Sequence, residues 1–392
     1  MAVHATLVTD GTQVEGLRDE WDQLALAQPA PPLLRPGFCL SWWRHLGRGR
    51  PLVVVARDGG GRLVGLAPLH ERAVGPVRLV RWMGHGYGTL GELLLADRSG
   101  AAEAIWRRLA GDDRVLDLRQ VRLDGAGITE LRRSAAWESQ LTVSDAAPYI
   151  DLTRVGDVDE LLATRRSLRK HFARLDRIVE RDGRDLSIEI AEQVDADELT
   201  RSIAATYDAA ERHHPRLPLL ATEATAAFLR DCITAMGAAE GLVVIVLRLE
   251  GEVAGFSLYL RTDATLSGWL TRYHPAAAAV SPGQLMHRAA AAWAIDHHID
   301  TIDLQIGDDA YKRRWSNGHL DAVDVLATAP GRLAIGRSAS RSVELAHHSK
   351  TALRQLASAV TRIGGRRSTP PMEPSDPPPG KAGRPSSSPP ER

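Results

Sequence analysis

The side chains best suited to chemistry follow one predicted strand in the C-terminal half of the chain. An acid, a phenol and an ammonium group occur there at Asp303, Tyr311 and Lys312. An amine that attacks a thioester loses a proton, and the departing thiolate needs a proton or a positive charge nearby. These three side chains could divide those tasks. The spacing also fits a plainer interpretation, in which Tyr311 and Trp315 pack as an i, i+4 pair while Lys312 faces water.

A possible anion site precedes these residues, at the predicted start of a helix. Ser281, Pro282 and Gly283 stand directly before an apolar run with helical spacing. Proline suits the first position of a helix, and the first turn presents amide groups and a positive dipole end to anions. We expect the N–H groups of Gln284 and Leu285 to point out of the helix toward a phosphate. The alternative is that Ser281 only caps the helix.

A mixed sheet is needed to bring these residues together. The pattern predicts helices at 199–211 and 223–236, a hairpin at 243–259, a third strand at 265–273, a helix at 284–298, a buried strand at 301–306 and a helix from 308. Strands that are antiparallel on one side, with a βαβ crossover on the other, make a mixed α/β layer. Ligands gather where adjacent strands of such a sheet end.

The chain contains an internal repeat. PLVVVARDGGGRLVGLAPL (51–69) aligns with GLVVIVLRLEGEVAGFSLYL (241–260), and RVLDLRQVRLDG (114–125) aligns with TIDLQIGDDA (301–310). Each member of the first pair predicts a hairpin, because apolar β-branched runs flank a tight polar turn. Two matches in the same order indicate a duplication. The first half has no comparable glycine–proline helix start, so we expect it to be a degenerate partner domain.

Composition limits the possible classes of protein. The 392 residues suffice for two domains of ordinary size and a tail, and the 49 basic and 49 acidic side chains create no global field that would attract DNA. Cys39 and Cys232 form neither a disulfide framework nor a metal-ligand spacing, so we expect no metal and a reducing compartment. No secretory signal or membrane-spanning run is recognisable, which predicts a cytoplasmic protein without a transmembrane segment.

A basic amphipathic helix is predicted between the two halves. Residues 165–181 carry seven Arg or Lys side chains in seventeen positions, with an apolar face on the other side. Arg166 and Arg169 could contact an anionic substrate such as a nucleotide-sugar, a lipid-linked phosphate or tRNA, or the charges could simply be solvated. His213, in a loop after a predicted helix, is a candidate for contact with the acceptor.

The string YHPAAAAVSPGQLMHRAAAAWAIDHHIDTIDLQIGDDAYKRRWSNG resembles the C-terminal signature of the CelD/BcsL family of acetyltransferase-like proteins, which is often associated with polysaccharide biosynthesis. EWDQLALAQPAPP, SWWRHL and GRLVGLAPL resemble the N-terminal half of that family. The likeness covers about residues 15 to 320. The family belongs to the acyl-coenzyme A N-acyltransferase (GNAT) superfamily and resembles the tandem Fem-type peptidyltransferases, which use aminoacyl-tRNA.

The resemblance implies that Ser281, Gly283, Gln284 and Leu285 face the donor pyrophosphate and that Tyr311 and Lys312 line the reaction centre. The superfamily's Gln/Arg-x-x-Gly-x-Gly/Ala donor loop is replaced here by VSPGQL. The predicted fold is α/β, with two tandem GNAT-like domains of mixed sheets flanked by helices and a disordered C-terminal tail. The predicted segments are a degenerate domain at 1–150, the basic linking helix at 151–182, the domain with the active site at 183–330, a C-terminal helix at 331–365 and the tail at 366–392.

The function expected from this resemblance is acyl transfer from acetyl-coenzyme A, or another acyl-coenzyme A, to an amine or hydroxyl of a sugar or cell-envelope precursor. Asp303 would assist proton removal, while Tyr311 or Lys312 would stabilise charge. One alternative is Fem-like aminoacyl transfer, with tRNA as the partner. Another is a non-catalytic scaffold within a polysaccharide-biosynthesis assembly. The chain has no G-x-x-x-x-G-K-[ST], G-x-S-x-G or H-E-x-x-H motif.

Overall fold

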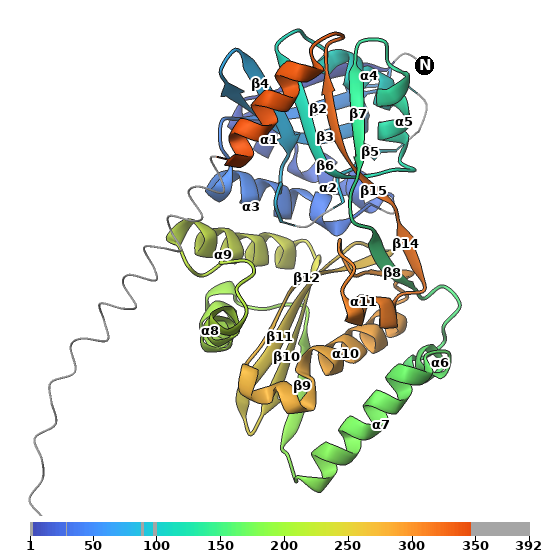
Figure 1. Ribbon diagram of the computed structural model, residues 1–392, viewed down its shortest axis with the longest axis vertical. Helices are drawn as coiled ribbons and strands as arrows, with labels where there is room; N and C mark the ends of the chain where they lie inside the picture. The colour runs from blue at the N-terminus through green and yellow to red at the C-terminus, as the bar shows by residue number, and fades with distance from the viewer. Residues whose placement is uncertain (1–2, 29, 88–89, 97–99, 346–392) are drawn as a thin grey trace, which may run out of the picture. The chain divides into compact units, whose positions relative to one another are not determined.

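Two mixed sheets, each flanked by helices, organise the chain (Figure 1). The computed structural model describes residues 3–28, 30–87, 90–96 and 100–345. This architecture confirms the predicted α/β fold. Both hairpins of the internal repeat are present as antiparallel pairs, β2 with β3 and β10 with β11.

The first sheet has the strand order β1-β2-β3-β4-β6-β15-β7, with β5 beside β3. Its strands are β1 His4–Val8, β2 Arg50–Arg57, β3 Leu63–Val74, β4 Val77–Trp82, β5 Leu94–Leu95, β6 Arg114–Arg122, β7 Glu138–Val143 and β15 Ala322–Thr328. Its helices are α1 Gly11–Glu15, α2 Arg18–Leu26, the 3₁₀ turn η1 Pro32–Leu34, α3 Pro36–Leu46, α4 Ala101–Leu109 and α5 Ala126–Arg133.

The second sheet has the order β14-β8-β13-β12-β11-β10-β9. Its strands are β8 Ala147–Asp151, β9 Leu186–Ala191, β10 Leu242–Leu249, β11 Glu252–Arg261, β12 Thr265–Tyr273, β13 Thr301–Asp303 and β14 Gly318–Leu320. Its helices are α6 Val158–Ala163, α7 Arg166–Arg181, α8 Ala196–His213, α9 Glu223–Ala238, the 3₁₀ turn η2 Pro275–Val280, α10 Pro282–Asp296 and α11 Ala310–Trp315.

Each sheet contains a parallel pair in a matching place. β4 pairs with β6 in the first sheet, and β12 pairs with β13 in the second. In both sheets the first strand of the parallel pair comes directly after the hairpin in the chain. A helix separates it from the second strand of the pair. The repeat seen in the sequence therefore extends to the order and direction of the strands.

The two sheets exchange strands. β8 pairs with β13 and β14 in the second sheet, and β15 lies between β6 and β7 in the first. Neither sheet is therefore built from one of the predicted ranges 1–150 and 183–330 alone. Pairing between such distant segments leaves no local pattern in the sequence, which is why it was not predicted.

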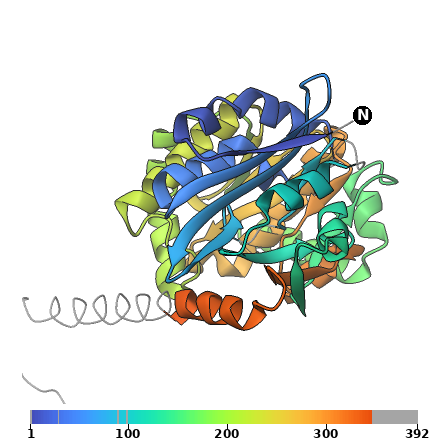
Figure 2. The same ribbon diagram turned by 90° about the horizontal axis from the view of Figure 1, so that it is seen from above.

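Alternating side chains on β2 show that helices cover both faces of the first sheet. Val53 and Val55 pack into a core with α2 and α3, whereas Leu52, Val54 and Ala56 pack into another with α4. Successive residues of a strand point to opposite faces, so the continuous apolar run belongs to a strand that is buried on both sides. Seen from above, the helices lie on opposite sides of these strands (Figure 2).

The core that includes α3 continues into the second half through α9. Phe38 of α3 meets Phe228 of α9 edge to face, with ring centroids 5.7 Å apart, and meets Trp269 of β12 at the same distance. All three side chains pack in the same core. The two halves are thus held by a shared apolar core, in addition to the exchanged strands.

The predicted basic helix is present as α7, with Leu168, Phe172 and Leu175 buried on its apolar face. At the C-terminal end, the chain is helical over 333–345. The rest of the predicted helix, up to residue 365, and the predicted tail at 366–392 lie outside the described residues. None of the helices in the described part of the chain has the length and apolar character needed to cross a membrane.

Candidate active site

Two helices of the second half begin at the same edge of the sheet, where β12 and β13 separate. The strands pair in parallel as far as Ser267 opposite Asp303. β13 stops there, whereas β12 continues to Tyr273. The chain leaves β12 through η2 into α10 and leaves β13 toward α11. Both helices therefore follow the carboxyl ends of adjacent strands, the place where α/β sheets gather ligands.

Asp303 lies at the point of separation and is buried. Its carboxylate accepts hydrogen bonds from the Ser267 hydroxyl at 3.0 Å, the Gln305 backbone N–H at 2.8 Å and the Gln305 side-chain amide at 2.5 Å. Burial raises the pKa of Asp303, while the bonds from Gln305 and Ser267 and the charge of Lys312 oppose that rise. The carboxylate is thus already occupied by donors from the protein.

Lys312 is also buried, with 4% of its surface exposed. Its Nζ donates to the carbonyl oxygens of Ile306 at 2.7 Å and Gln305 at 3.0 Å, and lies 3.9 Å from the Asp309 carboxylate. Burial lowers the pKa of Lys312, and Asp309 and Asp303 oppose this shift. The plainer prediction that Lys312 faces water is therefore wrong. The ammonium group thus ties α11 to the loop that precedes it.

Tyr311 is the more exposed neighbour, at 36%. Burial of the rest of the side chain raises its pKa to about 12, and the Asp309 carboxylate adds to that rise. The phenol is therefore protonated at neutral pH. The Arg216 guanidinium opposes the shift for Tyr311 and acts on Lys312 as well. The segment after α8 thus brings a positive charge near both side chains, and nothing in the sequence pattern indicated this.

The first turn of α10 differs from the expectation for an anion site. Ser281 has a left-handed backbone, with φ of 51°, and its side chain makes no capping hydrogen bond. Its carbonyl oxygen accepts the N–H groups of Gln284 at 2.9 Å and Leu285 at 3.2 Å. The prediction that these two amides are free is wrong, because the turn folds back on its own cap residue. The Gly283 N–H has no hydrogen-bond partner among the described residues.

The side chains of Gln284 and Leu285 hold α10 in place. Gln284 Oε1 accepts a hydrogen bond from the Trp315 indole at 3.0 Å, which ties α10 to α11. Leu285 is buried in the core of the second half. Trp315 is fully buried in the same core. The start of α10 and the helix that carries Tyr311 therefore form one rigid corner.

His287 and Tyr259 also belong to this corner, and no motif in the sequence pointed to either of them. The Tyr259 hydroxyl lies 3.0 Å from His287 Nδ1, and both side chains are buried. The His287 ring contacts Trp315 and Tyr311 edge to face, with centroids 4.9 and 6.2 Å apart. A polar residue among Leu285, Met286 and Ala290 on the apolar face of the helix was the available signal.

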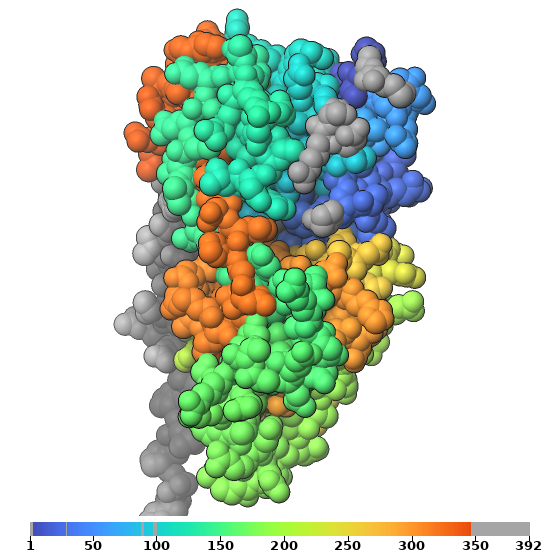
Figure 3. All heavy atoms as spheres, turned by 90° about the vertical axis from the view of Figure 1, so that its right-hand side faces the viewer, coloured from blue at the N-terminus to red at the C-terminus, as the bar shows by residue number. Residues whose placement is uncertain are grey.

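The predicted substrate-binding residues lie on two helices, α7 and α8. Arg166 and Arg169 are exposed on α7, and neither has an ion-pair partner among the described residues. Phe172 anchors α7 against Trp315, with ring centroids 5.9 Å apart. The green segment that includes α7 lies on the surface of the second half (Figure 3). His213 is exposed at the end of α8, three positions before Arg216.

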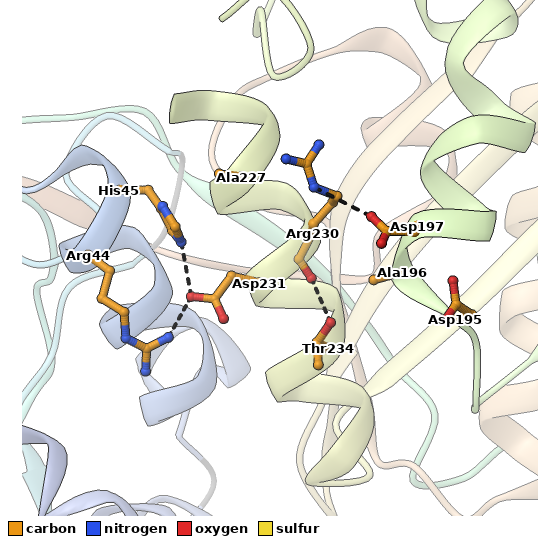
Figure 4. A pocket seen from close by; sticks show the side chains of 9 residues that line it. All are labelled: Arg44, His45, Asp195, Ala196, Asp197, Ala227, Arg230, Asp231 and Thr234. Atoms are coloured by element: carbon orange, nitrogen blue, oxygen red, sulfur yellow. Dashed lines mark hydrogen bonds and ion pairs between the residues drawn. The ribbon is translucent and has the colours of Figure 1, made fainter. Parts of the chain in front are cut away.

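A surface cleft of about 510 Å³ lies elsewhere, between α3, α9 and the start of α8 (Figure 4). It shares no residue with the corner. Asp231 of α9 accepts hydrogen bonds from Arg44 at 2.5 Å and lies 3.2 Å from His45. Arg230 pairs with Asp197 at 3.6 Å. Because the charges that line the cleft pair with one another, we place the candidate site at the corner instead. The described residues include no group of three or more His, Cys, Asp or Glu side chains placed to hold a metal ion.

A comparison with protein families matches residues 164–313, less than half of the chain, to the acetyltransferase (GNAT) domain. The matched stretch begins just before α7 and ends within α11, so it contains α10 and Tyr311, while Trp315 lies two residues beyond its end. No curated protein matches the chain.

Solved structures share the fold. FemX superposes with a TM-score of 0.59 and 12% identity, covering 81% of this chain and 98% of FemX. The C-terminal domain of a putative lysylphosphatidylglycerol synthetase from Agrobacterium fabrum has a TM-score of 0.56 and 13% identity, covering 85% of this chain and 96% of that domain. A conserved protein of unknown function from Bacteroides thetaiotaomicron has a TM-score of 0.55 and 12% identity, with coverage of 82% and 100%.

The domain match defines the class: residues 164–313 match the acetyltransferase (GNAT) domain, which supports a transferase. This confirms the predicted enzyme class. At such low identities the solved structures show the fold alone and do not identify the substrates.

Proposed function

We propose that the second half transfers an acyl group, an acetyl group in the simplest case, from acyl-coenzyme A to an amine or hydroxyl of a sugar or another cell-envelope precursor. The observation that carries this proposal is the contact between the protonated Tyr311 phenol ring of α11 and His287 of α10, with ring centroids 6.2 Å apart. The predicted link with polysaccharide biosynthesis rests on the CelD/BcsL resemblance and is part of the proposal.

In the proposed reaction, the acceptor nitrogen or oxygen attacks the thioester carbonyl carbon. A C–N or C–O bond forms, the C–S bond breaks, and the thiolate takes the phenolic proton of Tyr311. The proton lost by the acceptor then passes through solvent to the tyrosinate. The acyl donor binds with a phosphate at the Gly283 N–H and the positive end of α10. In this proposal Ser281, Gln284 and Leu285 shape the turn that binds the donor. They do not contact the phosphate, because their backbone groups bond to one another.

Asp303 and Lys312 act as positioning residues in this proposal. Asp303 ends β13 and Lys312 lies in α11, on the two sides of the loop that joins these elements. Each is engaged by protein groups: Asp303 by three donors and Lys312 by two carbonyl oxygens. Burial raises the pKa of Asp303, but protein donors already occupy its carboxylate, so in this proposal it holds the loop in place and does not take the proton of the acceptor. Together they fix the direction from which Tyr311 enters the site.

The acceptor is proposed to carry negative charge. Arg216 lies close enough to act on Tyr311, and Arg166 and Arg169 are exposed cations on α7. α7 packs against α11 through the Phe172–Trp315 contact. A nucleotide-sugar or lipid-linked phosphate matches this charge. His213, at the end of α8, is proposed to face the acceptor.

Replacing Tyr311 by Phe tests this function. The ring and its contact with His287 remain, but the proton donor is lost, so we expect kcat for acyl transfer to fall by roughly 10²-fold while KM for acetyl-coenzyme A changes little. The measurement is the release of free coenzyme A thiol with a panel of amino sugars and nucleotide-sugars. Arg313→Gln, an exposed neighbour on the same helix, is the control. An unchanged rate in Tyr311→Phe removes the phenol from the mechanism.

The second candidate is Fem-like aminoacyl transfer, which the unpaired cations of α7 favour. An aminoacyl-tRNA donor would lie along that helix with its phosphates. Thermal unfolding separates the possibilities, because a ligand stabilises only a protein that binds it. A shift with acetyl-coenzyme A and none with tRNA supports the first candidate, the reverse supports the second, and no shift with either favours a scaffold.

A further inference from the structure

His287 carries a buried nitrogen without a partner. The side chain lies on the inner face of α10 and is 7% exposed. Its Nδ1 is 3.0 Å from the Tyr259 hydroxyl, but Nε2 is buried and makes no hydrogen bond among the described residues. Leaving a buried polar atom unpaired costs free energy, so such an atom in a native structure calls for a ligand or a functional reason.

The hydrogen bond to Tyr259 indicates which nitrogen carries the proton. If the Tyr259 hydroxyl donates to Nδ1, the neutral ring has its proton on Nε2. The Ser257 hydroxyl also bonds to the Tyr259 oxygen and lowers the pKa of Tyr259, as a donor to that oxygen does, so the Tyr259 O–H is the proton available to Nδ1. Donation by Tyr259 therefore makes Nε2–H a donor. Burial lowers the pKa of His287 to about 4, so the ring is neutral at physiological pH.

The contacts of the His287 ring place it within the candidate site. The ring is held between α10 and α11 by its contacts with Trp315 and Tyr311. The Tyr259 ring lies against β12: a Cβ added at Gly268 would be 3.6 Å from it and 3.8 Å from the Asp303 carbonyl oxygen. His287 is thus the polar group that lies among Tyr311, the start of α10 and the place where β12 and β13 separate.

We propose that His287 is a donor-binding residue whose Nε2–H donates a hydrogen bond to the carbonyl oxygen of the acyl thioester. The bond strengthens as that oxygen gains negative charge during attack, and the ring has no need to change its protonation state. Tyr259 is the positioning residue that fixes the tautomer. This inference rests on the proposed function, because it requires an acyl thioester at the corner.

The test compares acetyl-coenzyme A with coenzyme A, which lacks the carbonyl, by calorimetric titration of the full chain. We expect the wild-type protein to bind acetyl-coenzyme A more tightly by roughly tenfold, the factor that one buried hydrogen bond provides. In His287→Phe, which keeps a ring of similar size, the preference for acetyl-coenzyme A is lost while the affinity for coenzyme A stays the same. Exposed His298→Asn, just after the end of α10, is the matched control and keeps the preference.

A second measurement does not depend on the variant folding. In protein labelled with ¹⁵N histidine, we expect the Nε2 signal of His287 to move on addition of acetyl-coenzyme A and to move much less with coenzyme A. Tyr259→Phe, which leaves His287 in place, is expected to reduce the preference for acetyl-coenzyme A.

The outcomes separate the two proposals. If the wild-type protein binds neither coenzyme A species, the proposed donor is wrong and the inference falls with it. If it binds both, but His287→Phe keeps the full preference or the Nε2 signal is the same with both ligands, the inference is overturned while the proposed function stands.

Discussion

Gly283 supplies the free N–H group in the first turn of α10, and its position offers a clean experiment. A Cβ built there meets nothing closer than 3.9 Å, at the Tyr273 ring. Gly283→Ala should therefore leave the fold intact and stabilise it slightly, by up to about 1 kcal/mol, because alanine loses less backbone entropy in a helix.

The same methyl group stands next to the amide proposed for the donor phosphate. We expect Gly283→Ala to weaken acetyl-coenzyme A binding by roughly tenfold or more, as a lost charge-assisted hydrogen bond would. Calorimetric titration measures the affinity, and denaturant unfolding checks the stability. Gly251→Ala is unsuitable as a control because that residue has a positive φ of 79°. Gly11→Ala, with open space around it, serves instead. Unchanged donor affinity would place the phosphate elsewhere.

Two buried histidines make the stability of the protein depend on pH. Burial lowers the pKa of His70 and of His287 to about 4. Because the unfolded chain binds these protons near pH 6.5 and the folded chain does not, the stabilisation is fully present above that pH. It is lost as the pH falls from about 6.5 to 4.

The loss from these two side chains is on the order of a few kcal/mol. Urea unfolding at several pH values between 7 and 4 measures it. In His287→Phe, the dependence on pH in that range should be weaker than in the wild-type protein, whereas exposed His213→Gln should behave like the wild-type protein. An equal slope in wild type and His287→Phe contradicts the assignment.

The residues of the site were predictable only in part. Tyr311 and Asp303 could be proposed from the sequence because their types suit proton transfer and because they stand at or after the end of a predicted strand. The burial of Lys312 was not predicted, because a lysine beside two arginines on a short helix is normally solvated. His287 lacks any signal beyond being a polar residue on an apolar helix face, and its role depends on Tyr259, which belongs to another strand.

At the scale of elements, α7 combines a buried apolar face with an unpaired basic one. Four of its basic side chains are exposed and have no ion-pair partner among the described residues: Arg166, Arg169, Lys170 and Arg174. Arg181, by contrast, pairs with Asp182 at 2.7 Å. The periodicity of the sequence sufficed to predict this helix, since Leu168, Phe172 and Leu175 recur at helical spacing. The periodicity does not indicate which ligand the basic face of α7 contacts.

We expect Arg166→Gln combined with Arg169→Gln to weaken binding of a phosphate-bearing acceptor and to make the remaining affinity less sensitive to salt. Stability should change by less than about 0.5 kcal/mol, as is usual for exposed substitutions. Titrations with a nucleotide-sugar and with tRNA between about 50 and 200 mM salt measure the affinity and its dependence on salt. Arg181→Gln is the control. If the double variant binds both ligands like the wild-type protein, the charges of α7 are only solvated.

At the scale of the whole molecule, Arg35 joins the two halves. The residue is 1% exposed and forms two hydrogen bonds with the Asp22 carboxylate, at 2.8 and 2.7 Å. The same guanidinium donates to the carbonyl oxygens of Arg261 at 2.9 Å and Ala239 at 2.8 Å in the second half. Its charge is therefore fully satisfied only when both halves are in place.

We expect Arg35→Ala to destabilise the protein by about 3–5 kcal/mol, because the half-buried Asp22 carboxylate and two carbonyl groups lose their partner. Denaturant unfolding followed by tryptophan fluorescence measures the loss. Arg62→Ala, whose side chain is 81% exposed, is the control and should change little. A loss below about 1 kcal/mol would show that water replaces the guanidinium.

The exchange of β8 and β15 has a consequence for a cleaved chain. A protease that cuts between β8 and α6 would leave one fragment with β8 inside the second sheet and the other fragment with β15 inside the first. Each fragment would stay interlocked with the other through complete ladders of backbone hydrogen bonds. Nicked molecules should therefore migrate as a single particle until a denaturant separates them, and neither fragment should complete its own sheet when it is expressed alone.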